Sequence, residues 1–528
     1  MNFQSYAYGL NHWEVDKDLQ HVLGHYWKDV NRYAESLGDF GRLAGTEVYE
    51  AAYHIDHEAG PVLVMHDLDG RRVDRVRLSP VEKSLLKQLA VINRPPYEGG
   101  SWHHHFAYGY LLADPGLYCV LTITNQTAYA IHKYAPDHAA WKEKLLGGEM
   151  FGATWMSENQ GGSDLGANVT QAVHENGYWR LTGDKFFASG AGLTDLAITT
   201  ARPMGAQSGP KGLALFLLPR EVESGELNFH VRRLKDKSAT RAVPSGEVEL
   251  DQARAILVGK AEEGIYYTLE NLTVSRLANA IAAMGIAKKG HLEVIERVRR
   301  RHSFGQALID HPLIRRDLSE LAIRQIAGTA LAFHAVDAFD HSWTEKPPYS
   351  ANYHYARFLS HLAKNRTAAH ASAITALAME LFGGLGFMDE YAIARWHREA
   401  LITPIWEGPS NIQALDFLEA MQKKQAHESF LADFLPTLEA SGDESARIAR
   451  DVMQGTLQQL AKLAPQEAQW YAKDALNRLA DAAQIGLLLR LAETGGDRYH
   501  KLAELYATYF LKKEELPSWA ADDPELWR

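Results

Sequence analysis

The sequence "ANVTQAVHENGYWRLTGDKFFASG", residues 167–190, decides the fold class of this 528-residue chain. Polar and apolar residues alternate on both sides of Asn176-Gly177. An Asn-Gly pair between two alternating runs is the strongest short-range signal for a β-hairpin. Two further strand-like runs follow along the chain, "GLALFLLP" (212–219) and "SGEVEL" (245–250). The sequence therefore predicts a β-rich segment in the middle of the chain.

Helical patterns flank this segment, which extends from about residue 151 to residue 258. The pattern over residues 18–135 is mostly helical and is broken by turns such as "DLDGRR" (67–72). Amphipathic helical stretches resume at residue 262 and continue to about residue 513. We predict an α+β fold of four segments. These are an N-terminal helical domain (1–148), a middle β domain (149–258), a helical bundle (259–421) and a C-terminal helical appendix (422–528).

The segment "LEVIERVRRRHSFG" (292–305) carries charges at helical spacing. Residues four apart on a helix are neighbours, so opposite charges at that spacing form ion pairs. The expected pairs are Glu293–Arg297 and Glu296–Arg300. Arg299 and Arg301 are then left without local partners. Arg301 either complements the helix dipole or is available to a pyrophosphate group.

The composition limits the class of protein. A single cysteine, Cys119, excludes an intramolecular disulfide and fits a reducing compartment. The N-terminus lacks the pattern of a secretory signal and no apolar run reaches membrane-spanning length, so we expect a cytoplasmic protein without a membrane partner. The formal net charge is −11, and residues 420–528 hold 13 Lys and Arg against 17 Asp and Glu. This charge argues against nucleic-acid binding driven by bulk electrostatics.

One carboxylate lies in unusual surroundings, in "LITPIWEGPSNIQALDFL" (401–418). Glu407 follows Ile405 and Trp406, and no cation is near it in sequence. It is either an acid at the start of a helix, with Ser410 or Gly408 as the cap, or a general base whose proton affinity is set by apolar surroundings. The residues alone leave both interpretations open.

Three other motifs are candidates for chemistry. In "FGATWMSENQGGSDLGAN" (151–168), hydroxyls and unobstructed backbone N–H groups suit a phosphate or a ring edge, although an ordinary turn has the same composition. "FGGLGF" (382–387) follows a predicted helix, so it fails the context of a dinucleotide-binding fingerprint. "SWHHHF" (101–106) would place His103 and His105 on one side of a strand. No acid stands at ligand spacing, so we predict no metal site there.

Six motifs follow one another along the chain: "MSENQGGSD", "GDKFFASG", "SRLANAIAAMGIA", "RRHSFGQALIDHPLI", "MELFGGLGF" and "IWEGPSNIQ". In this order they resemble the acyl-CoA dehydrogenase superfamily of flavoproteins. "FGRLAG" (40–45), "LKDKSATRAVPSGEVEL" (234–250) and the C-terminal appendix further resemble the adaptive-response branch, which is linked to alkylation damage. The resemblance implies a helical domain, a β domain and a four-helix bundle, followed here by the extra helical appendix.

The same resemblance assigns roles to residues of this chain. It implies FAD as the cofactor, an acyl-CoA thioester as the substrate, and Glu407 as the base that removes the α-proton while a hydride leaves to flavin N5. Arg276 and Trp406 fall on the substrate side. Arg301 and Phe304 match residues that reach the FAD of a neighbouring subunit, in a homo-oligomer built as a dimer of dimers. The expected FAD contacts are Met156, Ser157, Gly162, Ser163, Phe187, Ser189, Arg301, Phe304, Glu380, Gly383 and Gly384.

The sequence departs from the family pattern at several positions. Pro409 replaces a common Thr or Ser and removes a hydroxyl and a backbone donor, and Pro312 stands where a Gln is frequent. The implied electron acceptor is an electron-transfer flavoprotein. Two other functions stay open. One is a DNA-associated protective flavoprotein with weak or no dehydrogenase activity, and the other is a flavin oxidase or monooxygenase on the same fold.

Overall fold

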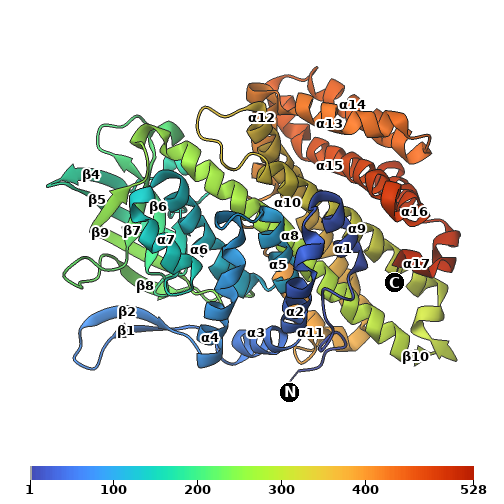
Figure 1. Cartoon of the computed structure of the whole chain (residues 1–528), viewed down its shortest axis with the longest axis horizontal. Helices are drawn as coiled ribbons and strands as arrows, with labels where there is room; N and C mark the ends of the chain where they lie inside the picture. Colours follow the sequence, from blue (N-terminus) through green and yellow to red (C-terminus); the bar gives the residue numbers. More distant parts are fainter. Residues whose placement is uncertain (1–2, 528) are drawn as a thin grey trace. The chain divides into compact units, whose positions relative to one another are not determined.

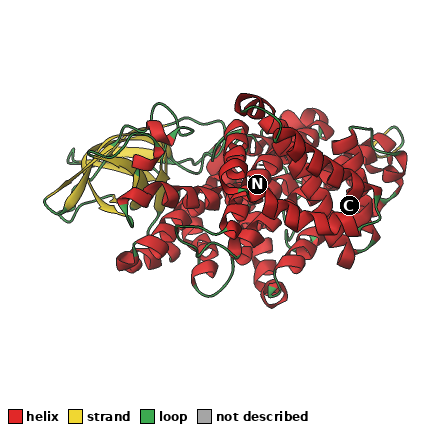
Figure 2. Ribbon diagram, turned by 90° about the horizontal axis from the view of Figure 1, so that it is seen from above, coloured by secondary structure: helices red, strands yellow, loops and turns green. Residues whose placement is uncertain are grey.

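The computed structural model describes residues 3–527, which pack into two compact units. The first, called here the helical unit, comprises Met1–Tyr49, Ser101–Ala113 and Arg276–Arg528. The second, called the β unit, comprises Glu50–Gly100 and Asp114–Ser275. Figures 1 and 2 show the elements of each unit. Among residues 3–527, no helix combines the length and the apolar character that crossing a membrane requires.

The β unit is built on one seven-stranded sheet in the order β3-β6-β4-β5-β9-β7, with β8 paired to β9. Because β6 also pairs with β7, the strands β6, β4, β5, β9 and β7 form a closed ring. In Figure 2 these strands gather in one group. The strands are β3 (Gly152–Trp155), β4 (Gln171–Glu175), β5 (Tyr178–Ser189), β6 (Leu196–Pro203), β7 (Ala214–Pro219), β8 (His230–Leu234) and β9 (Ser245–Leu257).

The predicted hairpin at Asn176-Gly177 is confirmed. Glu175 of β4 faces Tyr178 of β5, and the two turn residues have φ of 52° and 82°. Positive φ at both central residues is the requirement of the tight turn that Asn-Gly favours. The strand-like runs at 212–219 and 245–250 lie in β7 and β9, which confirms them as strands.

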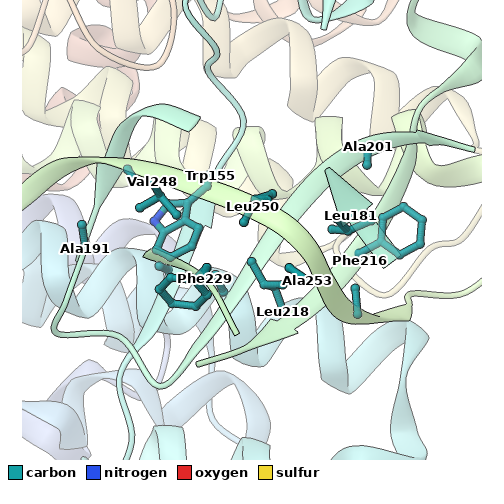
Figure 3. Close-up of a cluster of buried hydrophobic side chains, with 14 of the residues drawn as sticks. Trp155, Leu181, Ala191, Ala201, Phe216, Leu218, Phe229, Val248, Leu250 and Ala253 are labelled. Carbon is teal, nitrogen blue, oxygen red and sulfur yellow. The ribbon is translucent and has the colours of Figure 1, made fainter. Parts of the chain in front are cut away.

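Buried side chains from the strands of the sheet form one hydrophobic core of the β unit (Figure 3). The indole of Trp155 meets the ring of Phe229 edge to face, with centroids 4.9 Å apart. Phe216 and Leu218 of β7 alternate with residues that pack on the other side of the sheet, as the two-residue period of a strand requires. The core thus holds β3 and β5 next to each other, which positions the loop that follows β3.

Helices and a small hairpin complete the β unit. Helix α6 packs on β3 and β6, and its N-terminus is capped by Asp114, whose side chain accepts a hydrogen bond from the N–H of Leu117. The turn at 67–72 is not a break between helices as predicted, because it joins the two strands β1 and β2. The elements are β1 (Val62–His66), β2 (Arg72–Arg77), α4 (Pro80–Leu89), α6 (Pro115–Tyr134), α7 (Ala139–Leu146) and the first turns of α8 (Gly264–Arg300).

The helical unit is a bundle in which α9 and α10 pack along each other and α15 packs against both. Helix α12 lies against α10 and α15. A small hairpin, β10 (His302–Ser303) and β11 (Gln306–Ala307), follows α8. The helices are α1 (Lys17–Tyr26), α2 (Ala34–Gly45), the start of α3 (Glu47–His57), α5 (Trp102–Leu112), the rest of α8, α9 (Pro312–Asp340), α10 (Ala351–Leu381), α11 (Ala392–Ala400), α12 (Ser410–Lys424), α13 (Ala426–Ala440), α14 (Glu444–Leu460), α15 (Pro465–Gly495), α16 (Asp497–Tyr506) and α17 (Pro524–Trp527).

The helical unit corrects three sequence predictions. "SWHHHF" lies in helix α5 rather than in a strand, and His103 is buried beside Asp337 at 3.1 Å. The Glu296–Arg300 pair is confirmed at 3.0 Å, but Arg299 also pairs with Glu296 at 2.8 Å. Such i,i+3 pairing uses the same helical face as i,i+4 pairing.

The predicted Glu293–Arg297 pair is wrong because both side chains are buried and find tertiary partners. The Glu293 carboxylate accepts hydrogen bonds from the backbone N–H of Tyr6 at 2.8 Å and the hydroxyl of Tyr49 at 2.5 Å. The guanidinium of Arg297 donates to the carbonyl oxygen of Phe382 at 2.8 Å. Burial therefore overrides the local charge pattern of α8.

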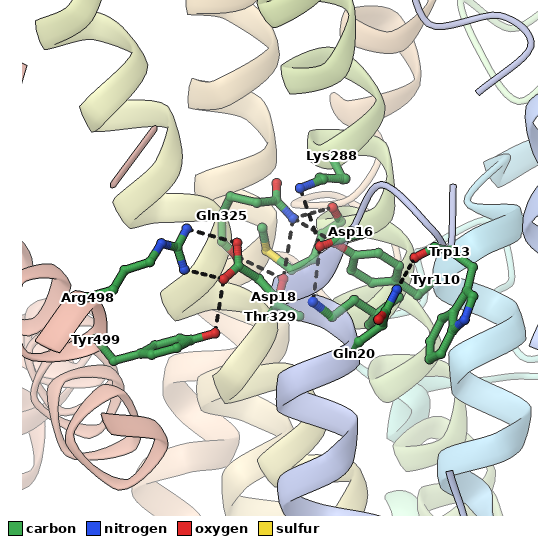
Figure 4. Close-up of polar contacts among 12 residues, drawn as sticks. Trp13, Asp16, Asp18, Gln20, Tyr110, Lys288, Gln325, Thr329, Arg498 and Tyr499 are labelled. Atoms are coloured by element: carbon green, nitrogen blue, oxygen red, sulfur yellow. Dashed lines mark hydrogen bonds and ion pairs between the residues drawn. The ribbon is translucent and has the colours of Figure 1, made fainter. Parts of the chain in front are cut away.

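Polar contacts join the start of α1 to α5, α8 and α16 within the helical unit (Figure 4). Asp16 accepts a hydrogen bond from Tyr110 at 2.9 Å and pairs with Lys288 at 3.3 Å. Asp18 accepts hydrogen bonds from Arg498 and, at 3.0 Å, from Tyr499. Asp16 is buried and Asp18 is half-buried, and both carboxylates are paired. The Asp18 contacts fix α16 on α1.

Candidate functional site

The loop after β3 in the β unit is held by a buried ion pair. Lys185 of β5 lies 2.8 Å from Glu158 and also donates to the carbonyl oxygen of Thr200 at 2.8 Å. The Glu158 carboxylate accepts the backbone N–H of Val169 at 2.6 Å and that of Thr170 at 3.3 Å. One carboxylate therefore joins both ends of the loop 158–170 to the sheet.

Burial and pairing act in opposite directions on this carboxylate. Burial raises the pKa of Glu158, but the Lys185 ammonium and the hydrogen bonds outweigh it, so that the pKa lies below its ordinary value of 4.5. Burial lowers the pKa of Lys185, and the Glu158 charge opposes that shift. The lowered pKa of Glu158 keeps its carboxylate charged near neutral pH, and this carboxylate holds the loop.

This pair predicts acid sensitivity of the β unit. Because the folded-state pKa of Glu158 is lowered, its contribution to stability is fully present above pH 4.5 and is lost as the pH falls through the lower folded value. The free energy of unfolding, measured by guanidinium titration, should decrease more steeply below about pH 4.5 in the wild type than in Glu158→Gln/Lys185→Met. Equal slopes in the two proteins would contradict this role of the pair.

The structure brings four of the predicted FAD contacts in the β unit near one another. The N–H of Phe186, next to Phe187, donates to the carbonyl oxygen of Ser157 at 3.0 Å. The indole N–H of Trp155, next to Met156, donates to the carbonyl oxygen of Ser189 at 2.9 Å. The C-terminal end of β3 thus lies beside the C-terminal end of β5.

The surface of this region suits a flat or phosphate-bearing group. The ring of Phe187 is 58% exposed although most large aromatic side chains of the chain are buried. A Cβ on Gly162 would lie 2.2 Å from the Ser157 hydroxyl oxygen, so the loop packs closely there only because residue 162 has no side chain. Ser163 is exposed in the same loop.

Glu407 in the helical unit has a rare backbone conformation. Its φ is +59° and that of Gly408 is +93°. The left-handed region costs a non-glycine residue about 1–2 kcal/mol, and such strain persists only where surrounding contacts enforce it. Helix α12 then begins at Ser410, with Pro409 before it and no side-chain cap. The cap predicted at Ser410 or Gly408 is therefore wrong, because Pro409 occupies the N-cap position and Ser410 is already the first residue of the helix.

Buried donors surround the two carbonyl groups of this turn. Arg276 of α8 donates from Nε to the Glu407 oxygen at 3.2 Å and pairs with Asp416 at 2.9 Å. Gln413 donates to the Glu407 oxygen at 2.8 Å and to the Gly408 oxygen at 2.9 Å. Lys364 of α10 donates to the Gly408 oxygen at 2.8 Å. Side chains from three helices thus fix the backbone from the Glu407 carbonyl to the Gly408 carbonyl.

The charges around the turn are perturbed by burial. Burial lowers the pKa of Lys364 to about 7, although the nearby charge of Glu407 opposes this shift. Burial also lowers the pKa of Arg276, and Asp416 opposes it. Burial and the Arg276 charge lower the pKa of His361 to about 3, so its neutral ring pairs with the Gln413 amide oxygen at 2.9 Å.

Trp406 is held beside the same turn. Its indole N–H donates to the amide oxygen of Asn279, and the Asn279 amide donates to the carbonyl oxygen of Thr403 at 3.0 Å. Asn279 lies one helical turn after Arg276 on α8. The structure therefore brings the two residues expected at the substrate side, Arg276 and Trp406, together with Glu407, the expected base.

The remaining predicted FAD contacts of the helical unit lie at, or just after, the C-terminal ends of α8 and α10. Phe304 is 95% exposed at the tip of the β10–β11 hairpin, and the Arg301 guanidinium makes no ion pair with any residue in the range 3–527. Glu380 is exposed in the last turn of α10, and Gly383 follows with φ of +64°. The bond from Arg297 to Phe382 joins the two helix ends.

Comparisons with known proteins agree with this arrangement. Family models match three consecutive stretches: the N-terminal domain of the adaptive response protein AidB over residues 2–150, the acyl-CoA dehydrogenase middle domain over 153–253 and the acyl-CoA dehydrogenase C-terminal domain over 262–422. Acyl-CoA dehydrogenase family member 11 of Caenorhabditis elegans is 30% identical over 481 residues, 85% of this chain and 76% of that protein. The chain belongs to the acyl-CoA dehydrogenase family. AidB of Escherichia coli K12 is 29% identical over 427 residues, 76% of each protein.

Solved structures confirm the family fold. The C. elegans protein ACDH-11, in complex with C11-CoA, has a TM-score of 0.85 at 24% identity, covering 97% of this chain and 93% of that one. A structure described as Bd2924 in its apo form has a TM-score of 0.82 at 27% identity, covering 93% and 100%. The resemblance read from the six motifs is thereby confirmed, together with the α+β fold class.

Sequence reasoning did not identify the residues that support this family's site in the present chain. Lys364 and Gln413 reach the Glu407 turn from different helices, and no local pattern marks them. The position of Lys185 could have been recognised from the sequence. It lies four residues after Leu181 in the same alternating run, so both side chains point to the same buried face, where a lysine needs a partner. The partner, Glu158, lies in the "MSENQGGSD" motif itself.

Proposed function

We propose that this protein is an FAD-dependent dehydrogenase that oxidises the α,β carbon–carbon bond of an acyl-CoA thioester. The observation that carries the proposal is the turn at Glu407 and Gly408. Its backbone is left-handed, and three buried side chains donate hydrogen bonds to its carbonyl oxygens. Family membership supports the reaction class. A relative's structure contains C11-CoA, which supports an acyl-CoA as the substrate.

Each residue of the turn is assigned a role in this proposal. Glu407 removes the α-proton of the thioester, because a half-buried carboxylate beside the bound substrate can act as a general base. Its backbone N–H donates to the thioester oxygen as negative charge develops there. Trp406 covers the acyl chain, and Arg276 holds the Glu407 carbonyl. The family resemblance supports these assignments.

The residues of the β unit fit a flavin. Phe187 offers an exposed aromatic face, the Ser157 and Ser189 hydroxyls are donors, and the Gly162 loop permits close approach of a backbone. When bound, FAD supplies the acceptor for the β-hydride. We propose Met156, Ser157, Gly162, Ser163, Phe187 and Ser189 as its contacts from this unit. From the helical unit we propose Arg301, Phe304, Glu380, Gly383 and Gly384.

The proposal is tested by anaerobic titration of the purified flavoprotein with acyl-CoAs of different chain length and branching. Bleaching of the visible flavin band by one class would support the reaction and identify the substrate class. A band that dithionite reduces but no acyl-CoA bleaches would contradict it. An electron-transfer flavoprotein is the proposed acceptor, and rapid oxygen consumption without any acceptor would favour the oxidase alternative instead.

Exposed apolar side chains of the helical unit support self-association. Phe304, Leu313 and Phe387 are 95%, 75% and 86% exposed, and an exposed phenylalanine at a hairpin tip is costly unless a partner covers it. We propose a homo-oligomer, arranged as a dimer of dimers, in which this surface is covered by another copy. Sedimentation velocity should show a smaller species for Phe304→Asp. An unchanged species, with Trp470→Asp as the control at another exposed aromatic, would contradict this.

The DNA-associated function and the cytoplasmic location remain predictions. The acidic excess in residues 420–528 opposes binding to a polyanion. A duplex-binding assay tests the DNA-associated function. Binding at low salt that weakens as salt is added would support it, because binding driven by phosphate contacts depends on salt, and no binding at low salt would contradict it.

A further inference from the structure

Two neighbouring carbonyl groups, those of Glu407 and Gly408, accept four hydrogen bonds from buried side chains. Two of the three donors are themselves fixed by a second partner. Asp416 holds Arg276, and His361 holds Gln413. The third donor, Lys364, differs from them. Within residues 3–527, its only hydrogen bond is the one to the Gly408 oxygen.

The burial of Lys364 requires an explanation beyond packing. Its side chain is 1% exposed, although removing an ammonium group from water is unfavourable unless it is paired. An apolar side chain of similar volume, such as methionine, would fill the same space without this cost. The one hydrogen bond that the lysine makes and methionine cannot make is the bond to the Gly408 carbonyl oxygen.

The conformation of the turn shows what this bond controls. Glu407 and Gly408 both have positive φ, a conformation from which a non-glycine residue relaxes when its contacts are lost. The Gly408 carbonyl belongs to the peptide group at the C-terminal side of this strained pair. Rotation of that peptide changes ψ of Gly408 and with it the path by which the chain enters α12. The Glu407 side chain moves with the turn.

We propose that Lys364 is a positioning residue, which fixes the left-handed Glu407–Gly408 turn through the Gly408 carbonyl and so holds the Glu407 carboxylate at one place. The inference rests on the proposed function of Glu407 as the α-proton base. Arg276 on α8 and Gln413 on α12 hold the same turn from the other sides, so Lys364 completes a cage of three donors. The carboxylate itself performs the proton transfer. Lys364 holds the Gly408 carbonyl by a hydrogen bond, and its ammonium group also lies near the Glu407 charge.

The test compares Lys364→Met with a control on the same helix. Asn365→Leu removes a neighbouring buried hydrogen bond, that to Asn477 at 2.8 Å, which lies away from the turn. For each variant we would measure kcat, KM and the melting temperature. We would also measure deuterium exchange at the α-carbon of a 3-thia-acyl-CoA. This thioester has sulfur in place of the β-carbon, so it reports proton removal without hydride transfer.

Lys364→Met should lower kcat and the exchange rate by the same factor, about 10- to 100-fold, because a displacement of the base of about 1 Å has an effect of this size. KM should stay within about twofold, since ground-state binding is not changed. Asn365→Leu should lower the melting temperature without lowering either rate. If Lys364→Met does not fold, Lys364→Gln, which keeps a polar group too short to reach the carbonyl, carries the same expectation.

Equal rates in Lys364→Met and Asn365→Leu would overturn the positioning role, provided that Glu407→Gln abolishes exchange. If Glu407→Gln retains exchange, Glu407 is not the base, and the proposed function of this residue fails instead. Absence of exchange in the wild type would overturn both proposals together. These three results are distinct, so the inference and the function on which it rests fail separately.

Discussion

Replacing Glu407 with glutamine should lower kcat for acyl-CoA oxidation by about 10³- to 10⁴-fold. Glutamine keeps the shape of the side chain but cannot accept the α-proton, and general-base catalysis typically contributes up to about 10⁴-fold. The hydrogen bonds from Arg276, Lys364 and Gln413 run to backbone carbonyl oxygens of the turn, which the substitution keeps, so the backbone geometry should persist. The measurement is steady-state oxidation with an artificial electron acceptor, with KM determined in parallel.

A matched control is available on the following helix. Glu419 of α12 is an exposed glutamate paired with Lys423 at 3.0 Å, and Glu419→Gln should leave kcat unchanged. Glu407→Gln should also still bind the acyl-CoA, because its apolar neighbours are intact. A variant that retains a tenth or more of the wild-type kcat would show that the α-proton is removed by another group.

Lys185→Met should destabilise the protein by about 3–5 kcal/mol, the largest stability effect that we expect. The substitution leaves the Glu158 carboxylate buried without its cation, and breaking a buried ion pair on one side has a cost of this size. The loop 158–170 depends on that carboxylate for the positions of Val169 and Thr170. The free energy of unfolding from guanidinium titration at pH 7 measures the effect.

An exposed pair in the same unit provides the comparison. Arg254 and Glu223 lie 2.9 Å apart with side chains 40% and 73% exposed, so Arg254→Met should cost less than about 1 kcal/mol. The double variant Glu158→Gln/Lys185→Met should recover part of the loss, because it removes the unpaired charge. If Lys185→Met lowers the free energy of unfolding no more than Arg254→Met does, the Glu158–Lys185 pair does not hold the loop 158–170.

Local sequence signals were sufficient for elements whose partners are near in sequence. The hairpin at Asn176-Gly177 is an example, because turn and alternation lie within one stretch. The hairpin at 62–77 was missed although it has a similar turn, in which the Asp67 carboxylate accepts the N–H groups of Asp69 and Arg71. Its strands are short and lie between helical patterns, so the Asp-Gly pair was interpreted as a break between helices.

The candidate site could be located from sequence only through the order of the family motifs. Those motifs identified Glu407 and the Ser157 loop. They gave no indication of the contacts that fix them, because Lys364, Gln413 and Lys185 reach their partners through tertiary packing. The Glu293–Arg297 prediction failed for the same reason, since each side chain is buried against a distant segment. Spacing along a helix cannot reveal which face the fold will bury.

The most direct test of the central claim is the identity of the product. The flavoprotein would be incubated with an acyl-CoA and an electron acceptor, and the thioester would be analysed by mass spectrometry. We predict a product lighter than the substrate by two hydrogen atoms, with a double bond between the α- and β-carbons, and no such product from Glu407→Gln. A thioester that is unchanged, or one that has gained oxygen, would contradict the assignment of this chain as an acyl-CoA dehydrogenase.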